Sequence, residues 1–333
     1  MPFIEDILKY KSISFVGMEK NAGKTQTLNY VLSRLRTFSK TIALTSIGVD
    51  GETTDIVTLT SKPEIEIYPN TTFITSQALY PQREIVSAIE EVSTQTTALG
   101  RLIKAKAITQ GKILLAGPSD TVNLKKLIEK LEKNTDLILI DGALSRKTFG
   151  SPSITQAMIL STGASLSASL NVVVKKTKFI YQMTQLPQYE GKHSEQLQQI
   201  ENGIYAITDE GIIDLKIPSL MMIDKYKDKI FDSGTKLFIA GALNDKFVQF
   251  LKIQKNIQDI EIIIKDFTKV FSNEDNTLQY LSKGGKIKVL DKANLIAITA
   301  NPISPTGYHF NNEEMLEALR REIPIKIYNI KQL

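Results

Sequence analysis

Near the start of the chain, a lysine and a hydroxyl side chain end a short glycine-containing run, Gly17-Met18-Glu19-Lys20-Asn21-Ala22-Gly23-Lys24-Thr25. The backbone N–H groups of such a loop converge on phosphate oxygens, and the helix that follows adds the positive end of its dipole. In this arrangement Lys24 would bind the β- and γ-phosphates and Thr25 would hold Mg²⁺. The predicted nucleotide-binding residues are Gly17, Lys20, Asn21, Ala22, Gly23, Lys24, Thr25 and Gln26.

The spacing of this run departs from the usual phosphate-loop pattern by one residue. The first glycine is expected at position 18, which is Met18 here, and Gly17 lies one residue early. A glycine-rich strand-to-helix turn with a solvated lysine is the competing interpretation. It explains poorly why Asn21, Ala22 and Gly23 precede the lysine in this order.

A bound Mg²⁺ also needs an acidic partner, and two segments offer one. Asp141 follows the apolar residues 137–140 and precedes Gly142, so its carboxylate would emerge at the carboxyl end of a buried strand. Asp50 and Glu52 lie in a polar loop after another strand, where they would complete the metal shell or orient an attacking water. An Asp that caps a turn and a plain polar turn remain the alternatives. The predicted metal ligands are Thr25, Asp141 and Asp50.

Further candidate residues follow other predicted strands. Arg146 or Lys147 would neutralise charge that develops on the γ-phosphate, although a solvated basic loop explains both equally well. The predicted catalytic residues are Lys24, Asp50, Glu52 and Arg146. Residues 161–164 and the proline-containing loop 299–309 are weaker candidates for ligand contact. The Asn-Lys-x-Asp element of guanine-specific GTPases is not found, which favours ATP.

Strands must alternate with helices to place these loops at one edge of a sheet. Short apolar runs predict strands at 12–16, 41–45, 112–116, 137–140, 171–174, 236–240, 260–264, 286–290, 295–299 and 325–328. Apolar residues at helical spacing predict helices at 26–38, 83–92, 123–131, 245–253 and 312–321. This order indicates an α/β fold with a doubly wound, mainly parallel sheet of the P-loop NTPase type and a second α/β region.

A glutamine-rich stretch divides the chain. The predicted organisation is a nucleotide-binding domain at 1–180, a linker or excursion at 181–213, and a second α/β domain or an extension of the same sheet at 214–333.

Composition limits the classes of protein that the chain can represent. Its 333 residues are 42% hydrophobic and 23% charged, which suits a globular protein with a sizeable core. The lack of cysteine excludes disulfides and thiolate chemistry, and two histidines are too few for a three-histidine metal site. The net charge of +5 comes from scattered lysines, so neither nucleic acid nor a membrane is an expected partner. We expect a cytoplasmic protein.

The residues Val16 to Thr25 resemble the phosphate loop of the ATPase-like subunit of the lysine 5,6-aminomutase reactivase. The resemblance extends to Asp141-Gly142-Ala143 with Arg146-Lys147 and Ser151-Pro152, to Leu160 to Ala164, and to the loop from Asn301 to Gly307. It implies a protein that uses ATP and Mg²⁺ to release damaged cobalamin from an adenosylcobalamin-dependent aminomutase. The implied partners are lysine 5,6-aminomutase and a second reactivase subunit.

The same loop is similar to that of the wider class of dimeric P-loop proteins that includes dethiobiotin synthetase and partition ATPases. This similarity implies a homodimer in which an early lysine acts across the interface. Lys20 is the nearest candidate, but it stands four residues before Lys24, where the class has five, and Glu19 occupies the matching position. Two other functions therefore stay open: an ATP-dependent ligase resembling dethiobiotin synthetase, and a nucleotide-binding scaffold without turnover.

Overall fold

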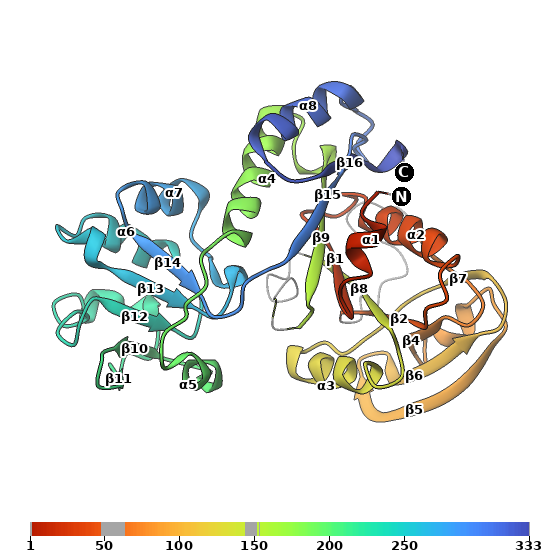
Figure 1. The fold of residues 1–333 in the computed structure, drawn as a ribbon, viewed down its shortest axis with the longest axis horizontal. Coiled ribbons are helices and arrows are strands. Elements are labelled where there is room, and N and C mark those ends of the chain that lie inside the picture. Colours follow the sequence, from red (N-terminus) through yellow and green to blue (C-terminus); the bar gives the residue numbers. More distant parts are fainter. Residues whose placement is uncertain (1, 48–63, 144–151, 153, 333) are drawn as a thin grey trace. The chain divides into compact units, whose positions relative to one another are not determined.

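The computed structural model describes residues 2–47, 64–143, 152 and 154–332, and it has the α/β class that the sequence predicts. The chain divides into two compact units (Figure 1). The first comprises Met1–Gly150, Ile154–Lys178 and Asn294–Leu333, and the second comprises Ser151–Ser153 and Phe179–Ala293.

The first unit is built on a nine-stranded mixed sheet with the order β16-β15-β9-β1-β8-β2-β4-β6-β5. Neighbours from β16 to β4 run parallel, whereas β6 is antiparallel to both β4 and β5. Its strands are β1 Ser12–Gly17, β2 Ile42–Ser46, β4 Thr72–Ser76, β5 Ser87–Thr97, β6 Gly100–Ala107, β8 Leu137–Ala143, β9 Ala157–Gly163, β15 Leu295–Asn301 and β16 Ile327–Asn329.

Helices cover both faces of this sheet. They are α1 Ile4–Ile7, α2 Lys24–Leu35, α3 Thr121–Leu131, α8 Asn312–Glu322 and α4 Leu170–Thr184, the last of which continues into the second unit. Because successive strand residues face opposite sides, Leu139 of β8 packs with Leu28 and Leu32 of α2, and its neighbour Ile138 packs with Leu124 of α3. The short elements of this unit are β3 Ile65–Ile67, β7 Gly111–Ile113, η1 Tyr80–Gln82, η2 Ala164–Leu166 and η6 Ile330–Gln332.

Most strands and helices that the sequence predicts are confirmed within a few residues at each end, but the helix predicted at 83–92 is wrong. That part of the chain contains η1 and the long strand β5, which forms a hairpin with β6 through the pairing of Thr97 with Gly100. Glu90 forms an ion pair across the hairpin with Lys104 at 3.0 Å. The chain from 87 to 97 is rich in β-branched residues, which favour such a ribbon.

The strand predicted at 171–174 is also wrong, because these residues lie in α4. Three consecutive valines favour a strand locally. In the structure, however, Val173 and Thr177 are buried, and the Thr177 hydroxyl donates to Val173 O at 2.7 Å, a side-chain bond to the carbonyl four residues earlier that Thr makes within helices. The strand predicted at 112–116 is confirmed only over Gly111–Ile113, where β7 pairs with β3 outside the main sheet.

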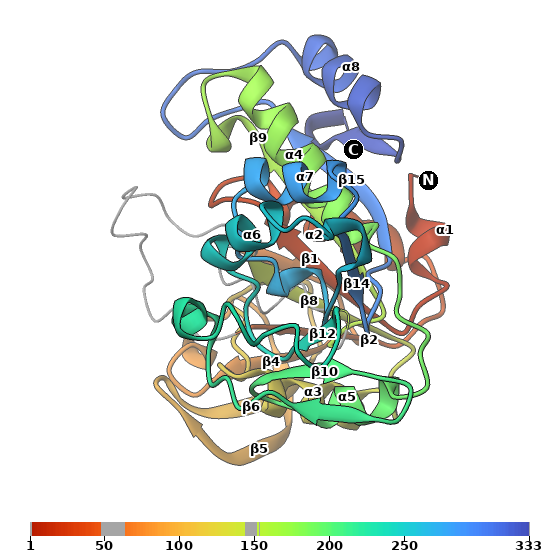
Figure 2. The same cartoon turned by 90° about the vertical axis from the view of Figure 1, so that its left-hand side faces the viewer.

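The second unit contains a five-stranded sheet with the order β11-β10-β12-β13-β14. Strands β12, β13 and β14 are parallel, and β10 is antiparallel to its neighbours β11 and β12. Helices α6 and α7 lie together on one face of the sheet (Figure 1), and Figure 2 shows them side by side in the turned view. The elements are α5 Ser194–Gln199, β10 Ile204–Ile207, β11 Ile212–Asp214, η3 Leu220–Lys225, β12 Lys236–Ile239, α6 Asp245–Lys252, η4 Ile257–Asp259, β13 Glu261–Ile264, η5 Phe267–Lys269, α7 Glu274–Ser282 and β14 Lys286–Val289.

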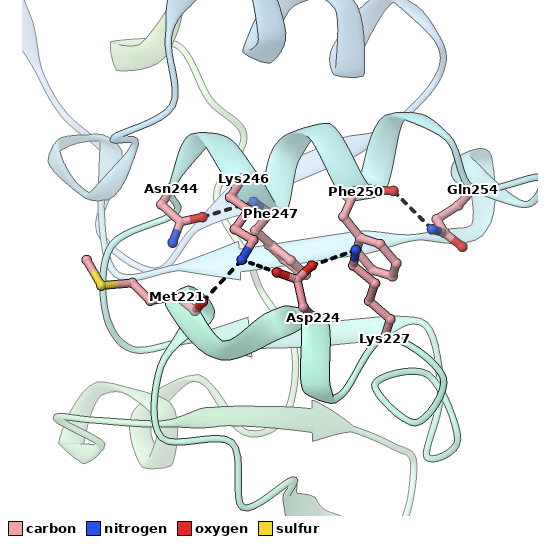
Figure 3. A network of polar contacts seen from close by, with 8 residues as sticks. All are labelled: Met221, Asp224, Lys227, Asn244, Lys246, Phe247, Phe250 and Gln254. Carbon is pink, nitrogen blue, oxygen red and sulfur yellow. Dashed lines mark hydrogen bonds and ion pairs between the residues drawn. The ribbon is translucent and has the colours of Figure 1, made fainter.

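Polar contacts fix the position of α6 in this unit (Figure 3). Asn244 caps the helix by accepting a hydrogen bond from the Phe247 N–H at 2.9 Å. Asp224 of η3 forms ion pairs with Lys227 and with Lys246 of α6. Hydrogen bonds from these two ammonium groups lower the pKa of the Asp224 carboxyl.

The division of the chain differs from the predicted one at residues 181–213, which are not a linker because they contribute α5, β10 and β11 to the second unit. Each of the two alternatives predicted for 214–333 holds for part of that range. Residues 214–293 belong to the second unit, whereas residues 294–333 extend the first sheet, where β15 pairs with β9. A pairing between strands more than 130 residues apart leaves no trace in local sequence patterns.

In the described part of the chain, no helix combines the length and apolarity that a bilayer span requires.

Candidate functional site

The segment predicted to bind phosphate connects β1 to α2 in the first unit. β1 ends at Gly17 and α2 begins at Lys24, so the predicted order of strand, loop and helix is confirmed. Asn21 and Gly23 have positive φ angles of 60° and 94°, which turn the chain sharply before the helix. The first turn of α2 carries neither a capping side chain nor an acidic residue. No side chain of that turn therefore competes with an anion for its N–H groups.

Both glycines at the ends of this loop stand where a side chain would be crowded. A Cβ on Gly17 would lie 3.2 Å from Glu19 O. A Cβ on Gly23 would lie 2.9 Å from Ile330 Cδ1 and 3.2 Å from Asn301 Cβ, and the positive φ would add strain. Gly23 therefore brings the loop into contact with segments from the end of the chain.

The lysine that starts α2 faces the acidic residue that the sequence predicts as a metal ligand. Lys24 Nζ lies 2.8 Å from Asp141 Oδ1, and the two side chains are 22% and 16% exposed. Asp141 lies on β8, directly beside Phe15 of β1 and Ser46 of β2. Among the described residues Asp141 Oδ1 has no well-aligned hydrogen bond, so the nearby ammonium compensates its charge mainly by electrostatic attraction.

A buried hydroxyl cluster joins α2 to two strands of the sheet. Thr27 Oγ1 lies 2.9 Å from Thr299 Oγ1 of β15, which in turn lies 2.9 Å from Ser161 Oγ of β9. All three side chains are fully buried. Ser161 also accepts a hydrogen bond through its carbonyl oxygen from the Met18 N–H at 2.9 Å. These contacts fix the loop and its helix against the sheet.

The two weaker candidate segments, 161–164 and 299–309, both reach the edge where this loop lies. Asn301 Nδ2 donates to Asn21 O at 3.0 Å. Gly163 gives Asn301 room, because a Cβ there would lie 2.3 Å from Asn301 O. The Tyr308 hydroxyl donates to Ala164 O. The loops after β1, β9 and β15 therefore form one continuous surface at the carboxyl ends of parallel strands, where α/β sheets bind ligands.

The structure describes some of the other predicted site residues but not all of them. Ala22 is a buried residue of the loop, Thr25 is half-buried on the first turn of α2, and Lys20 and Gln26 are exposed. Asp50, Glu52, Arg146 and Lys147 lie outside the described residues, so their predicted roles stay predictions.

One residue at this edge was missed by sequence reasoning. A Cβ on Gly117 would lie 1.8 Å from Ser46 O, so the backbone passes directly over the end of β2 beside Asp141. The Gly117-Pro118 pair marks a turn in the sequence, but not where that turn lies in the fold.

A surface cavity of about 540 Å³ lies at the opposite edge of the same sheet. It is lined by residues 8–11, 40–41 and 132–136, which precede β1, β2 and β8. The chemistry-bearing loops follow these strands, so the cavity is not part of the candidate site.

Comparison of the chain with family models, with curated proteins and with solved structures gives no match. Arguments about its function therefore rest on the residues and their geometry.

Proposed function

We propose that this chain is an ATP- and Mg²⁺-dependent P-loop protein that acts on a partner enzyme. The proposal rests above all on the contact between Lys24 and Asp141 at the carboxyl edge of the sheet. A cation at the start of a helix and a carboxylate at the end of the neighbouring strand are the pair that phosphate and its metal require.

The loop suits the phosphate groups of a nucleotide. It turns through two positive φ angles and delivers the chain to a helix whose first turn carries no acidic side chain. Lys24 would exchange Asp141 for the β- and γ-phosphates, at little electrostatic cost because one anion replaces another.

The donor set also suits Mg²⁺. Asp141 Oδ1 is a buried oxygen without a well-aligned hydrogen bond, and Thr25 supplies a hydroxyl one residue after the phosphate-binding lysine. One carboxylate and one hydroxyl fit an ion that keeps several waters and takes phosphate oxygens as its other ligands. Thr25 and Asp141, together with Asp50, would hold the ion, and when bound it would neutralise charge on the phosphates.

The resemblance to the reactivase subunit supports the choice of partner. In this proposal the chain remodels an adenosylcobalamin-dependent aminomutase, together with a second reactivase subunit, and uses ATP to release a damaged cofactor. Dimerisation across the nucleotide and catalysis by Asp50, Glu52 or Arg146 belong to the same proposal.

Phosphate release from Mg-ATP by the purified full-length chain tests this function. We expect turnover that rises when inactivated aminomutase is added, that is lost in Lys24→Ala, and that persists in Lys40→Ala. Lys40 is an exposed lysine at the opposite edge of the sheet, before β2, and so provides a matched control.

Three other results would count against the proposal. Stimulation by a small carboxylic acid in place of the aminomutase would indicate the ligase. ATP binding without turnover in any condition would indicate the scaffold. A parental chain that binds no ATP would overturn the P-loop assignment itself.

A further inference from the structure

The second unit has a lysine pair at the carboxyl end of its central parallel strand. β13 lies between β12 and β14, and all three run parallel. Lys265 is the first residue after β13, and Lys269 ends η5. Ligands of open α/β sheets bind beyond this end of the strands, so the position of the pair is one where a ligand is expected.

Lys265 is half-buried, and among the described residues its ammonium has one weak polar contact. Its Nζ donates to Gln198 O at 3.3 Å. Among the described residues, no carboxylate forms an ion pair with Lys265 or with Lys269. A partly buried ammonium without an ion-pair partner is costly, because burial removes water that would otherwise solvate the charge.

The neighbouring polar side chains are committed to other contacts. Asp291 Oδ1 accepts a hydrogen bond from Gln198 Nε2 at 2.7 Å, and Asp266 Oδ1 accepts one from the Thr268 N–H at 2.8 Å. These contacts hold the two carboxylates in place around the lysines.

The balance of charges around Lys265 is unfavourable for its protonated form. Burial lowers the pKa of the Lys265 ammonium most, and the positive charge of Lys269 lowers it further. Glu201, Asp291 and Asp266 act in the opposite direction, but more weakly than burial and Lys269 do. An anion beside the two lysines would offset the repulsion between them and favour the protonated form of Lys265.

The loop after the adjacent strand does not crowd this edge of the sheet. Gly241 follows β12, which is the neighbour of β13, and among the described residues a Cβ on Gly241 would meet no atom within 4 Å. The Leu243 N–H donates to Lys269 O at 2.8 Å, which holds the loop after β12 beside the lysine pair.

We propose that the second unit binds an oxyanion, such as the phosphate or carboxylate group of a small molecule, between Lys265 and Lys269 at the carboxyl end of β13. This site is independent of the proposed nucleotide function, because it uses none of the residues between Gly17 and Thr25.

Inorganic pyrophosphate is a suitable probe, measured by calorimetry on the full-length chain. The titration uses the Lys24→Ala background, in which the proposed nucleotide loop should bind phosphate about 10- to 100-fold more weakly. We expect Lys265→Met and Lys269→Met each to weaken pyrophosphate binding at least tenfold. Lys255→Met, at an exposed lysine elsewhere in the second unit, should leave binding unchanged.

A second measurement follows the reactivity of the lysines themselves. Lysine acetylation at pH 8, mapped by mass spectrometry on the parental chain, should modify Lys265 faster than Lys255, because an amine with a lowered pKa is more often neutral. Pyrophosphate should protect Lys265 and Lys269 but not Lys255. Equal binding by all variants, or no binding together with no protection, would overturn the proposal.

Discussion

Lys24 Nζ and Asp141 Oδ1 lie 2.8 Å apart at the carboxyl edge of the large sheet, although 117 positions separate them in the chain (141 − 24). The contact joins the first residue of α2 to a strand that lies between β1 and β2. Both groups are mostly buried, so neither is well solvated when its partner is removed.

The two members of this pair should have separable effects on nucleotide binding. Lys24→Ala removes a charge-assisted contact to phosphate, and ATP affinity should fall about 10- to 100-fold. Asp141→Asn keeps the lysine but removes the negative charge, so ATP should still bind while added Mg²⁺ no longer strengthens binding. Titration of a fluorescent ATP analogue with Mg²⁺ or with EDTA distinguishes the two variants. If Asp141→Asn retained the full Mg²⁺ effect, its assignment as a metal ligand would be wrong.

The packing around Gly23 can be measured against a second glycine with the same backbone. Gly23 and Gly307 have φ angles of 94° and 96°, but only at Gly307 would a Cβ meet no atom within 4 Å. Gly307→Ala should lower the free energy of unfolding by about 1–2 kcal/mol, the cost of a left-handed conformation. Gly23→Ala should cost more, because the methyl group would also press on Ile330 and Asn301. Urea unfolding measures the free energy lost in each variant. Equal losses in Gly23→Ala and Gly307→Ala would contradict the close packing of Gly23 against Ile330 and Asn301.

The parts of this site that lie close together in the sequence could be predicted from it, whereas the contacts between distant residues could not. The loop from Gly17 to Lys24 and the position of Asp141 follow from short patterns, because each strand and its following turn are contiguous in sequence. The link from Asn301 to Asn21 spans 280 residues, so no pattern along the chain indicates it. The same limit applies to β15, whose apolar run predicts a strand but not the sheet that it joins.

The wrong helix at 83–92 and the wrong strand at 171–174 have a different physical origin. At 83–92 the apolar spacing predicted a helix, but the β-branched residues from 87 to 97 favour a strand, and the structure follows the second signal. Glu90 forms its ion pair with Lys104 across the resulting hairpin. At 171–174, by contrast, local strand propensity was outweighed by packing from elsewhere in the fold. Val173 is buried on the face of a helix that also buries Thr177, whose hydroxyl bonds to Thr162 of β9 at 2.7 Å. Tertiary packing therefore decided the structure of residues 171–174.

The side chain of Asn301 should be needed for nucleotide binding. Asn301→Ala removes the hydrogen bond that fixes Asn21 O, and the affinity for ATP should fall several-fold as the loop loses its shape. Asn294 provides a matched control, since its amide also donates to a backbone carbonyl, that of Gln156, but just before β15 begins. Each variant should lose about 1 kcal/mol of unfolding free energy. Equal ATP affinities in the two variants would show that Asn301 has only a structural role.

The buried hydroxyl cluster should contribute to stability as a unit. Thr27→Val keeps the shape of the side chain but leaves Thr299 without one of its partners, so the free energy of unfolding should fall by about 1–3 kcal/mol. Thr37→Val, at an exposed residue just after α2, should change it by less than about 0.5 kcal/mol. Combining Thr27→Val with Thr299→Val should cost less than the sum of the two single changes, because they share one contact. Additive costs in urea unfolding would exclude the coupling.

Lys265 should make stability depend on pH in a defined direction. Its pKa is lowered in the folded chain below the ordinary 10.5, so the unfolded chain holds more protons between the two values. As the pH rises from the folded pKa toward 10.5, the titration of Lys265 should therefore increase the free energy of unfolding. Lys265→Met removes this contribution, whereas Lys255→Met, at an exposed lysine, retains it. Urea unfolding of the two variants between pH 7 and 10.5 compares their slopes, and the other titrating groups cancel in that comparison. Parallel curves would mean that Lys265 ionises in the folded chain as it does in water.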